Sequence, residues 1–376
     1  MAISRDTILS ERLRRQGLLE PVKTYEEYLA LFALIGPVSP PYFAYPGSPP
    51  NITHRADFDD MELAGRFRER RELVKGRFLN KTLGYVLEGD LELYANAFRR
   101  PLEKQTWTQR QVFRALETAG PLTPRQLSEE IDLMNKEVMP ALHRLQEAFL
   151  VYEDQLTTDW ERGWYVFTAE WPEITIAEDR WEAAASEVLL RFLESHFFAT
   201  AGQMKDWSGW ANKDVKRLLD ALAARGAILP VIVAGLGDGW MRAEDADLQA
   251  DPARPTVFML HKGDPLARSH ASELKARYHG IEVLQYLLID GAFQGAALGH
   301  WRIGPHDVDD IVVEYCLPRN APPAGKKSFV PWRGGIIRRI VISGDMQARM
   351  RVGVKVRFER SRYLRKLFYD DFPLFG

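Results

Sequence analysis

An approximate internal repeat constrains this chain more than any other feature of its sequence. Residues 107–170 and residues 182–244 follow one order: an amphipathic helix, a turn with a short second helix, a third helix, and two β-prone segments divided by a turn-rich gap. Three helices followed by a two-stranded wing is the pattern of a winged-helix module, whose third helix can enter the major groove of DNA. The repeat therefore predicts two adjacent winged-helix modules.

The helices of the repeat are predicted from apolar residues at helical spacing. Thr123 before Pro124 is a favourable start for the second helix of the first copy, because threonine caps helices well and proline suits the first helical position. The third helices carry Val138, Leu142, Leu145 and Phe149 in the first copy, and Val215, Leu218, Leu219 and Leu222 in the second. Each of these helices then presents its opposite, polar side to a partner.

Winged-helix units also serve in contacts between proteins, so the prediction of DNA binding depends on the tandem copies, which can follow a duplex. Each candidate contact taken alone is an ordinary surface residue, and the prediction concerns the face that they form together. The candidates are Arg125, Asn135, Lys136 and Arg144 in the first copy, and Lys205, Asn212, Lys213 and Lys216 in the second.

The two ends of the chain differ from the repeat. Residues 1–105 contain two helical patterns, a proline-rich stretch, a further helical pattern over 59–75, and a strand pair followed by a helix, which together predict a third, split winged helix. After about residue 254 short strands alternate with glycine and proline turns, which predicts an antiparallel barrel or sandwich with a basic tail.

The predicted fold class is thus α+β, with tandem winged helices followed by a β-rich domain. The predicted domains are 1–105, 106–175 and 176–253, which are winged-helix modules, and 254–376, which is barrel-like.

Composition limits the possible partners. The 376 residues carry 50 basic and 52 acidic side chains, a net charge of −2, so DNA binding requires locally segregated charge, as in the basic stretches 66–81 and 333–368. The sequence has neither a signal-peptide pattern nor an apolar run long enough to span a membrane, and its single cysteine is Cys316. We therefore expect a monomeric, cytoplasmic protein with no membrane contact.

The usual catalytic and metal motifs are absent from the sequence. The GLGDG segment precedes a β-prone segment rather than a helix, so it predicts a hairpin turn and not a phosphate loop. His261 and His270 are nine residues apart without a partnering cysteine, which does not favour zinc. We predict no cofactor and no metal.

Several segments resemble the AlkZ and YcaQ group of winged-helix DNA glycosylases. They are RLRRQGLLEP, ALIGPVS, FLNKTLGYVLEGDLELY, and HKGDPLARSH with GHWRIGP. The resemblance implies three winged helices and a β-barrel around a concave surface for double-stranded DNA, and metal-free removal of alkylated purines or unhooking of crosslinks. Arg77, Lys81 and Thr82 lie where the basic stretch 66–81 meets the third of these segments, and they join the predicted DNA contacts.

The catalytic motif that the resemblance implies is not preserved. That motif is a glutamine, any residue, then glutamine or aspartate, directly after a helix that here ends near Gly36; Ser39, Pro40 and Pro41 stand in those places. Proline accepts no proton and serine is a poor base, so we predict no catalytic residue and expect a non-catalytic or altered-specificity paralogue that binds DNA.

Two alternatives remain open from the sequence. One is an active glycosylase with a displaced base among Asp57, Asp59 and Asp60, although capping a helix is the ordinary role of such residues. The other is a winged-helix transcription regulator.

Overall fold

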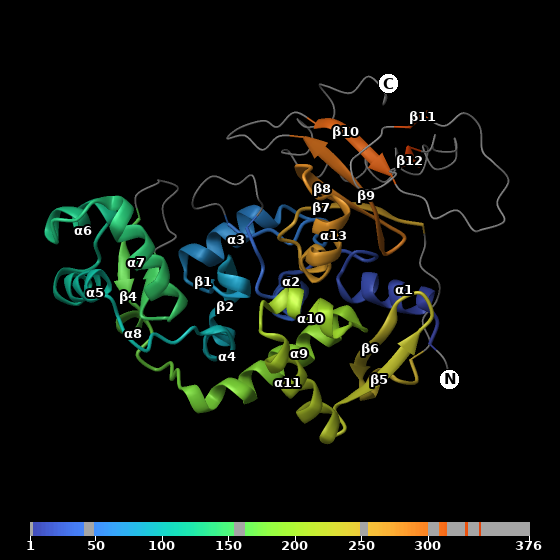
Figure 1. Ribbon diagram of the computed structural model, residues 1–376, viewed down its shortest axis with the longest axis horizontal. Helices are drawn as coiled ribbons and strands as arrows, with labels where there is room; N and C mark the ends of the chain where they lie inside the picture. The colour runs from blue at the N-terminus through green and yellow to red at the C-terminus, as the bar shows by residue number, and fades with distance from the viewer. Residues whose placement is uncertain are drawn as a thin grey trace.

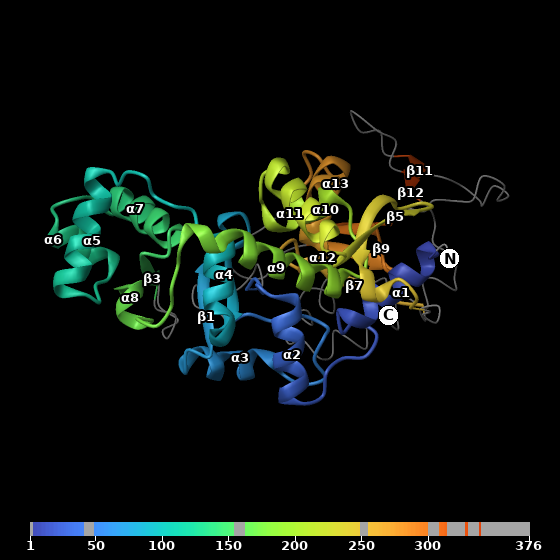
Figure 2. The ribbon, with the colours of Figure 1, turned by 90° about the horizontal axis from the view of Figure 1, so that it is seen from below.

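The computed structural model describes residues 3–40, 49–153, 162–248, 255–299, 308–313, 328–329 and 338–339. In these ranges the chain forms helices and small antiparallel sheets, arranged as an elongated body with the α5–α7 lobe at one end (Figures 1 and 2). This agrees with the mixed helix and strand content that we predicted. Within the described ranges, no helix combines the length and the apolar character needed to cross a membrane.

The N-terminal segment combines helices with one hairpin. It contains α1 (Arg5–Arg15), α2 (Tyr25–Ile35), α3 (Asp60–Glu69), β1 (Leu73–Arg77), the 3-10 turn η1 (Leu79–Lys81), β2 (Leu83–Leu87), the 3-10 turn η2 (Glu88–Asp90) and α4 (Leu91–Phe98). The helix predicted over 59–75 ends at Glu69, which corrects its C-terminal part. Arg71 has a φ of 60°, which a right-handed helix cannot contain, and Leu73 begins the antiparallel pairing with β2.

Both copies of the repeat have the predicted order of elements. The first contains α5 (Trp107–Ala119), α6 (Pro124–Glu130), α7 (Asn135–Glu147), β3 (Val151–Glu153) and β4 (Trp164–Val166), followed by α8 (Phe167–Glu170) and the 3-10 turn η3 (Glu178–Arg180). The second contains α9 (Trp181–His196), α10 (Ala201–Ser208), α11 (Asn212–Ala224), β5 (Ile228–Val233), β6 (Gly237–Arg242) and the 3-10 turn η4 (Ala243–Asp245). In each copy a reciprocal threonine–glutamine capping box starts the second helix, at Thr123 and at Thr200.

The two copies are packed differently. The first encloses a core of its own, in which Val112, Leu142 and Trp164 are buried together, and it forms the projecting lobe (Figure 2). The second shares its core with the N-terminal segment, because Leu189 of α9 packs in the same cluster as Tyr94 of α4. The long helix α9 therefore lies inside the body of the molecule.

The C-terminal segment forms one four-stranded sheet, and two helices lie between its first two strands in the sequence. Its elements are β7 (Val257–Leu260), α12 (Pro265–Ser269), α13 (Ala271–Arg277), β8 (Val283–Ile289), β9 (Ala292–Gly299) and β10 (Val308–Val313), with the short strands β11 (Ser328–Phe329) and β12 (Arg338–Arg339) paired separately. The strand order is β10-β9-β8-β7, antiparallel throughout. The described strands do not close into a barrel, and residues 340–376 of the expected β-rich domain lie outside the described residues.

Helix α1 lies between the second copy and the C-terminal sheet. Its Leu13, with Leu18 just beyond, shares a buried cluster with Phe258 of β7, while Ile8 packs with Phe197 after α9. The first helix of the chain is therefore enclosed by elements that come much later in the sequence.

Candidate nucleic-acid interface

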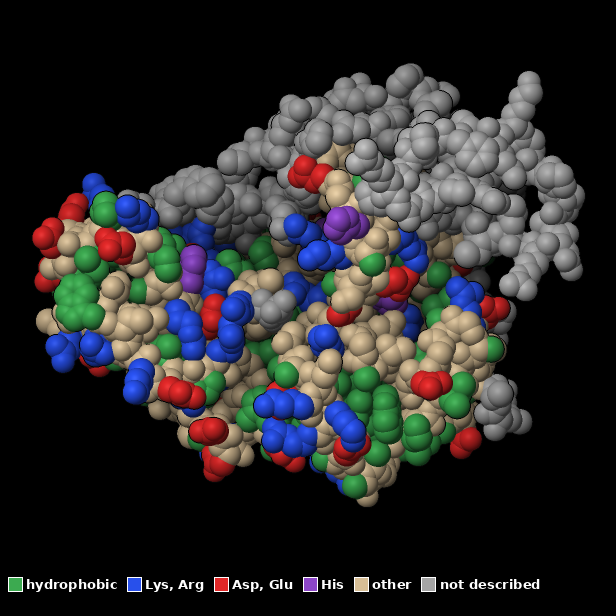
Figure 3. Space-filling model, viewed as in Figure 1, with side chains coloured by type: hydrophobic (Ala, Val, Ile, Leu, Met, Phe, Trp, Pro, Cys, Tyr) green, Lys and Arg blue, Asp and Glu red, His purple; other side chains and the backbone are tan. Residues whose placement is uncertain are grey.

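Lys and Arg side chains gather across the middle of one face, between the α5–α7 lobe and the part that carries α13, and again near α9 and α11 (Figure 3). Most of the predicted DNA contacts have exposed side chains. Exposed are Lys81, Thr82, Arg125, Asn135, Lys136, Lys205, Asn212, Lys213 and Lys216, whereas Arg77 and Arg144 are partly buried. Among them, Arg77, Lys81 and Thr82 come together in one turn; the others lie on four different helices.

The η1 turn is held in place by side-chain hydrogen bonds. Arg77, at the end of β1, donates from Nε to Gln146 Oε1 at 2.9 Å and from Nη1 to the carbonyl oxygen of Lys81 at 3.1 Å. Thr82 Oγ1 donates to the carbonyl oxygen of Leu79 at 2.6 Å. Lys81 has a φ of 65°, which is uncommon outside glycine, and its side chain is exposed. The turn thus presents Lys81 on a fixed backbone.

Arg268 of α12 approaches the same turn from the other side. Its Nη1 lies 3.5 Å from the carbonyl oxygen of Leu79, and its Nη2 lies 3.2 Å from Ser39 Oγ. Helix α12 is fixed by Asp264, which caps its N-terminus and forms a buried, two-pronged ion pair with Arg55 at 2.7 and 3.1 Å.

Ser39 is buried where the resemblance places the first catalytic residue. Only 7% of its surface is exposed, and a Cβ added to Gly263 would lie 3.0 Å from the Cβ of Ser39. The Ser39 side chain therefore lies close to Gly263, and its hydroxyl accepts from the Arg268 guanidinium. Pro41, the second of the two places, lies outside the described residues.

The three acids considered as a displaced base have separate surroundings. Asp59 caps α3 by accepting from the Met61 N–H, as expected of a capping residue. Asp60 accepts from the Ile52 N–H at 2.8 Å and from Asn51 Nδ2 at 3.1 Å, and burial raises the pKa of this carboxyl to about 7. Asp57 is exposed. Asp59 and Asp60 thus have roles in holding the N-terminal segment together.

Matching positions of the two copies carry the remaining candidates. Asn135 and Lys136 begin α7, and Asn212 and Lys213 begin α11. Lys216 forms an exposed ion pair with Asp220 at 2.5 Å.

Arg144 of α7 is bound within the chain. Its Nη1 donates to the carbonyl oxygen of Arg100 at 2.9 Å, and its Nη2 donates to that of Pro101 at 2.7 Å. Arg144 therefore ties α7 to the segment that leads into the lobe, which accounts for its partial burial.

Sequence analysis missed a buried group of charges beside Arg77. Glu153 Oε2 lies 2.7 Å from Lys75 Nζ, and Glu153 Oε1 lies 2.7 Å from Arg162 Nη1. Burial lowers the pKa of Lys75 to about 8. Burial acts to raise the pKa of Glu153, but the two cations outweigh it and hold that pKa below its usual value. In the sequence, the only sign of this buried charge group was a lysine inside the strand-like segment LVKGR.

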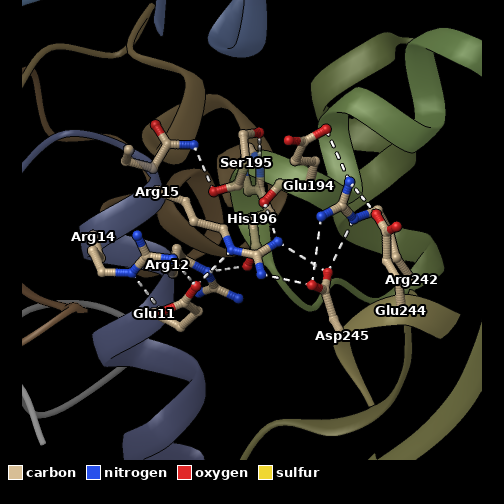
Figure 4. A network of polar contacts seen from close by, with 11 residues as sticks. Glu11, Arg12, Arg14, Arg15, Glu194, Ser195, His196, Arg242, Glu244 and Asp245 are labelled. Atoms are coloured by element: carbon tan, nitrogen blue, oxygen red, sulfur yellow. Dashed lines mark hydrogen bonds and ion pairs between the residues drawn. The ribbon is translucent and has the colours of Figure 1, made fainter. Parts of the chain in front are cut away.

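A second polar network joins α1 to the end of α9 (Figure 4). Four backbone carbonyls at that helix end accept hydrogen bonds from α1 and its C-cap. The bonds run from Arg15 Nη1 to Glu194 at 3.1 Å, from Gln16 Nε2 to Ser195 at 3.2 Å, and from Arg12 Nε and Nη2 to His196 and Phe198 at 3.1 and 2.8 Å. A helix C-terminus leaves such carbonyls without helical partners, so RLRRQGLL serves here as a cap supplied by another helix.

Gln16 connects this cap to the Arg55–Asp264 pair. Its Oε1 accepts from Arg55 Nη2 at 3.1 Å, while its Nε2 reaches the α9 terminus. The helix α12 that carries Arg268 is thus tied through buried contacts to α1 and α9.

The histidine and glycine motifs have structural contacts. His261 Nδ1 accepts from the Gly263 N–H, and His270 Nε2 lies 2.8 Å from Gln203 Nε2. The GLGDG segment forms the predicted hairpin turn, with positive φ at Gly235 and Gly237. No group of three His, Cys, Asp or Glu side chains suited to a metal occurs in the described ranges. Cys316 lies outside them.

Comparison with known proteins identifies related sequences and structures. A family model described as DNA glycosylase AlkZ-like matches residues 53–283. The fold is similar to that of the Streptomyces sahachiroi DNA glycosylase AlkZ, with a TM-score of 0.61 and 16% sequence identity over 86% of this chain and 93% of that chain. Among curated proteins, no sequence matches the chain significantly. The structural likeness concerns the fold, whereas the family match extends over more than half of the chain.

Proposed function

This chain belongs to the AlkZ-like family of DNA glycosylases, and on that premise we propose that it binds double-stranded DNA through tandem winged-helix modules. The modules are residues 1–105, 106–175 and 176–253, and residues 254–376 form a β-rich, barrel-like domain. The three-helix order followed by an antiparallel hairpin, which occurs in both copies, supports this division.

The proposed DNA surface is the basic face of Figure 3, and we propose that the η1 turn belongs to it. Arg77, Lys81 and Thr82 contact the backbone there, and the starts of α7 and α11 contribute their exposed Asn and Lys side chains. Phosphate contacts of this kind position a protein on DNA without reading its sequence. The alkylated or crosslinked state of the DNA is taken from the resemblance, and we include both as substrates to be tested.

We propose further that the protein excises bases weakly or not at all, or acts on a different lesion. The observation that carries this proposal is the contact of Arg268 with the hydroxyl of Ser39. Breaking a glycosidic bond builds positive charge on the sugar and requires an acceptor for the proton of the attacking water. A guanidinium at this point opposes the developing charge, and a serine hydroxyl that accepts from it is a poor base.

The test is excision of a damaged base by the wild-type protein. Duplexes carrying an N7-alkylguanine or an interstrand crosslink are incubated with the protein, and abasic sites are counted. We expect binding with little or no abasic product, since loss of general-base assistance typically lowers rates by about 10²- to 10⁴-fold. An active family member on the same duplexes controls for substrate quality. Robust release of the base would overturn this part of the proposal, and Asp57→Ala and Asp59→Ala would then be examined.

A further inference from the structure

Among the described residues, the junction between β1 and the first repeat copy holds more cationic than anionic side chains. Two carboxylates act on Arg77 there, Glu153 of β3 and Glu147 of α7. Both already have cationic partners. The ion pairs are Glu153 with Lys75 and with Arg162, at 2.7 Å each, and Glu147 with Arg100 at 3.1 Å. Arg77 therefore adds a positive charge that neither acid balances on its own.

The guanidinium of Arg77 is held at two of its three nitrogens. Nε and Nη1 donate to Gln146 Oε1 and to the carbonyl oxygen of Lys81, while in the described part of the chain Nη2 has no hydrogen-bond partner and the group has no ion pair. Its partial burial lowers the pKa of Arg77, because burial disfavours the charged form. A partly desolvated cation without an ion pair of its own costs free energy, which an anion bound at Nη2 would offset.

We propose that Arg77 binds one backbone phosphate of duplex DNA at the junction of the N-terminal module and the α5–α7 lobe. A planar guanidinium held at Nε and Nη1 offers Nη2 to a phosphate oxygen in a fixed direction, and it loses less side-chain freedom on binding than a flexible cation does. Exposed Lys81 on the same turn adds positive charge nearby. This inference rests on the proposed function, since it assumes that DNA occupies this face.

The hydrogen bond between Arg77 and Gln146 places the proposed phosphate contact between the lobe and the body. Gln146 belongs to α7 of the lobe, whereas Arg77 belongs to β1 of the body. A phosphate bound by Arg77 therefore lies where the lobe meets the body, and it neutralises charge contributed by both. The contact is to the backbone, so we expect it to act on damaged and undamaged duplexes alike.

The experiment measures how the affinity for a short, undamaged duplex changes with salt. Fluorescence anisotropy gives the dissociation constant from about 50 to 200 mM salt for the wild type, Arg77→Gln and Arg77→Lys. We expect Arg77→Gln to bind more weakly and to reduce the slope of log affinity against log salt by about one, the value for one lost phosphate contact. Arg77→Lys should keep the slope, because it keeps the charge. It should bind DNA several-fold more weakly, because it loses the guanidinium held in place by Gln146 and Lys81.

The matched control is Arg180→Gln. It removes the same charge, but its guanidinium is already paired with Glu92, so its slope should equal that of the wild type. Melting temperatures check that each variant is folded. If Arg77→Gln does not fold, Arg77→Lys carries the test, and wild-type affinity in that variant overturns the inference. A wild type that does not bind at low salt overturns the proposed function instead, whereas an unchanged slope in folded Arg77→Gln overturns only this inference.

Discussion

Two arginines that look alike in the sequence, Arg77 and Arg144, have different surroundings. Arg144 donates to two backbone carbonyls, 43 and 44 residues away along the chain, and so serves the packing of α7. Arg77 donates to a side chain 69 residues away, and its Nη2 has no hydrogen-bond partner in the part of the chain that the structure describes. Arg268 meets Ser39 across 229 residues. Sequence patterns report spacing along the chain, so they could nominate these residues but could not say what each one touches.

The titration of Asp60 gives a prediction at this scale. Burial raises the pKa of its carboxyl to about 7 in the folded protein, against about 4 for an unperturbed aspartate. Because the folded state holds the proton more tightly, Asp60 contributes stability below about pH 4 that is lost as the pH rises to about 7. Asp60→Asn removes this titration and keeps an acceptor for the Ile52 N–H. We expect thermal unfolding between pH 5 and pH 8 to shift less in the variant than in the wild type.

Asp59→Asn is the control for the neighbouring position. Asn is as good an N-cap as Asp, and Asp59 is exposed, so this variant should follow the wild-type pH dependence. An identical pH dependence in Asp60→Asn and the wild type would contradict the role assigned to Asp60.

At the scale of elements, local signals located most helix starts. Thr123 before Pro124 predicted the start of α6, which the structure confirms with a capping box. The apolar spacing of α7 and α11 matches their buried faces, except that Phe149 lies beyond the end of α7 with a positive φ. The prediction was wrong after Glu69, where Arg71 and the pairing with β2 end the helix. It also missed α12, although Asp264 before Pro265 is a helix start of the same kind as Thr123 before Pro124.

Helix α11 gives the prediction that belongs to this scale. Lys213 and Lys216 are exposed, while Leu218 and Leu222 on the same helix are buried, so the lysines can be changed without disturbing the core. Lys213→Glu with Lys216→Glu should weaken duplex binding several-fold and leave the melting temperature nearly unchanged, since the lost Lys216–Asp220 pair is exposed. Affinity is measured by anisotropy beside Lys23→Glu with Lys104→Glu, which changes the charge equally elsewhere. Unchanged affinity in the folded α11 variant would remove this helix from the interface.

For the whole molecule, the repeat predicted the order of elements but not their arrangement. It treated the two copies as equivalent, yet the first encloses its own core and the second shares one with α4. Nor did the pattern of α1 predict that it packs between α9 and the sheet containing β7. Which elements pack against each other depends on the complementarity of surfaces that are far apart in the sequence, and a single sequence does not show that complementarity.

The distribution of charge over the molecule gives the last prediction. The net charge of −2 offers no general attraction to DNA, so binding has to come from the basic face. Affinity for plain duplex should therefore fall steeply between about 50 and 200 mM salt, by about 10³-fold if six phosphates are contacted, because cations on DNA are released when Lys and Arg replace them. A titration of the wild type measures this. Affinity that does not respond to salt would show that the basic face is not the binding surface.

The cap on α9 has a consequence for the making of the protein. The carbonyl acceptors of Arg12 lie 184 and 186 residues further along the chain, and Asp245, the partner of Arg15, lies 230 residues further along. These bonds can form only after those residues have been synthesised. At about 5–20 residues per second, a ribosome needs roughly ten to forty seconds to synthesise the first of these. During that interval the apolar side of α1, including Ile8 and Leu13, has none of its final neighbours from α9 and β7. The apolar side of α1 is therefore exposed on the nascent chain, as a segment of the kind that chaperones shield, until α9 has been translated.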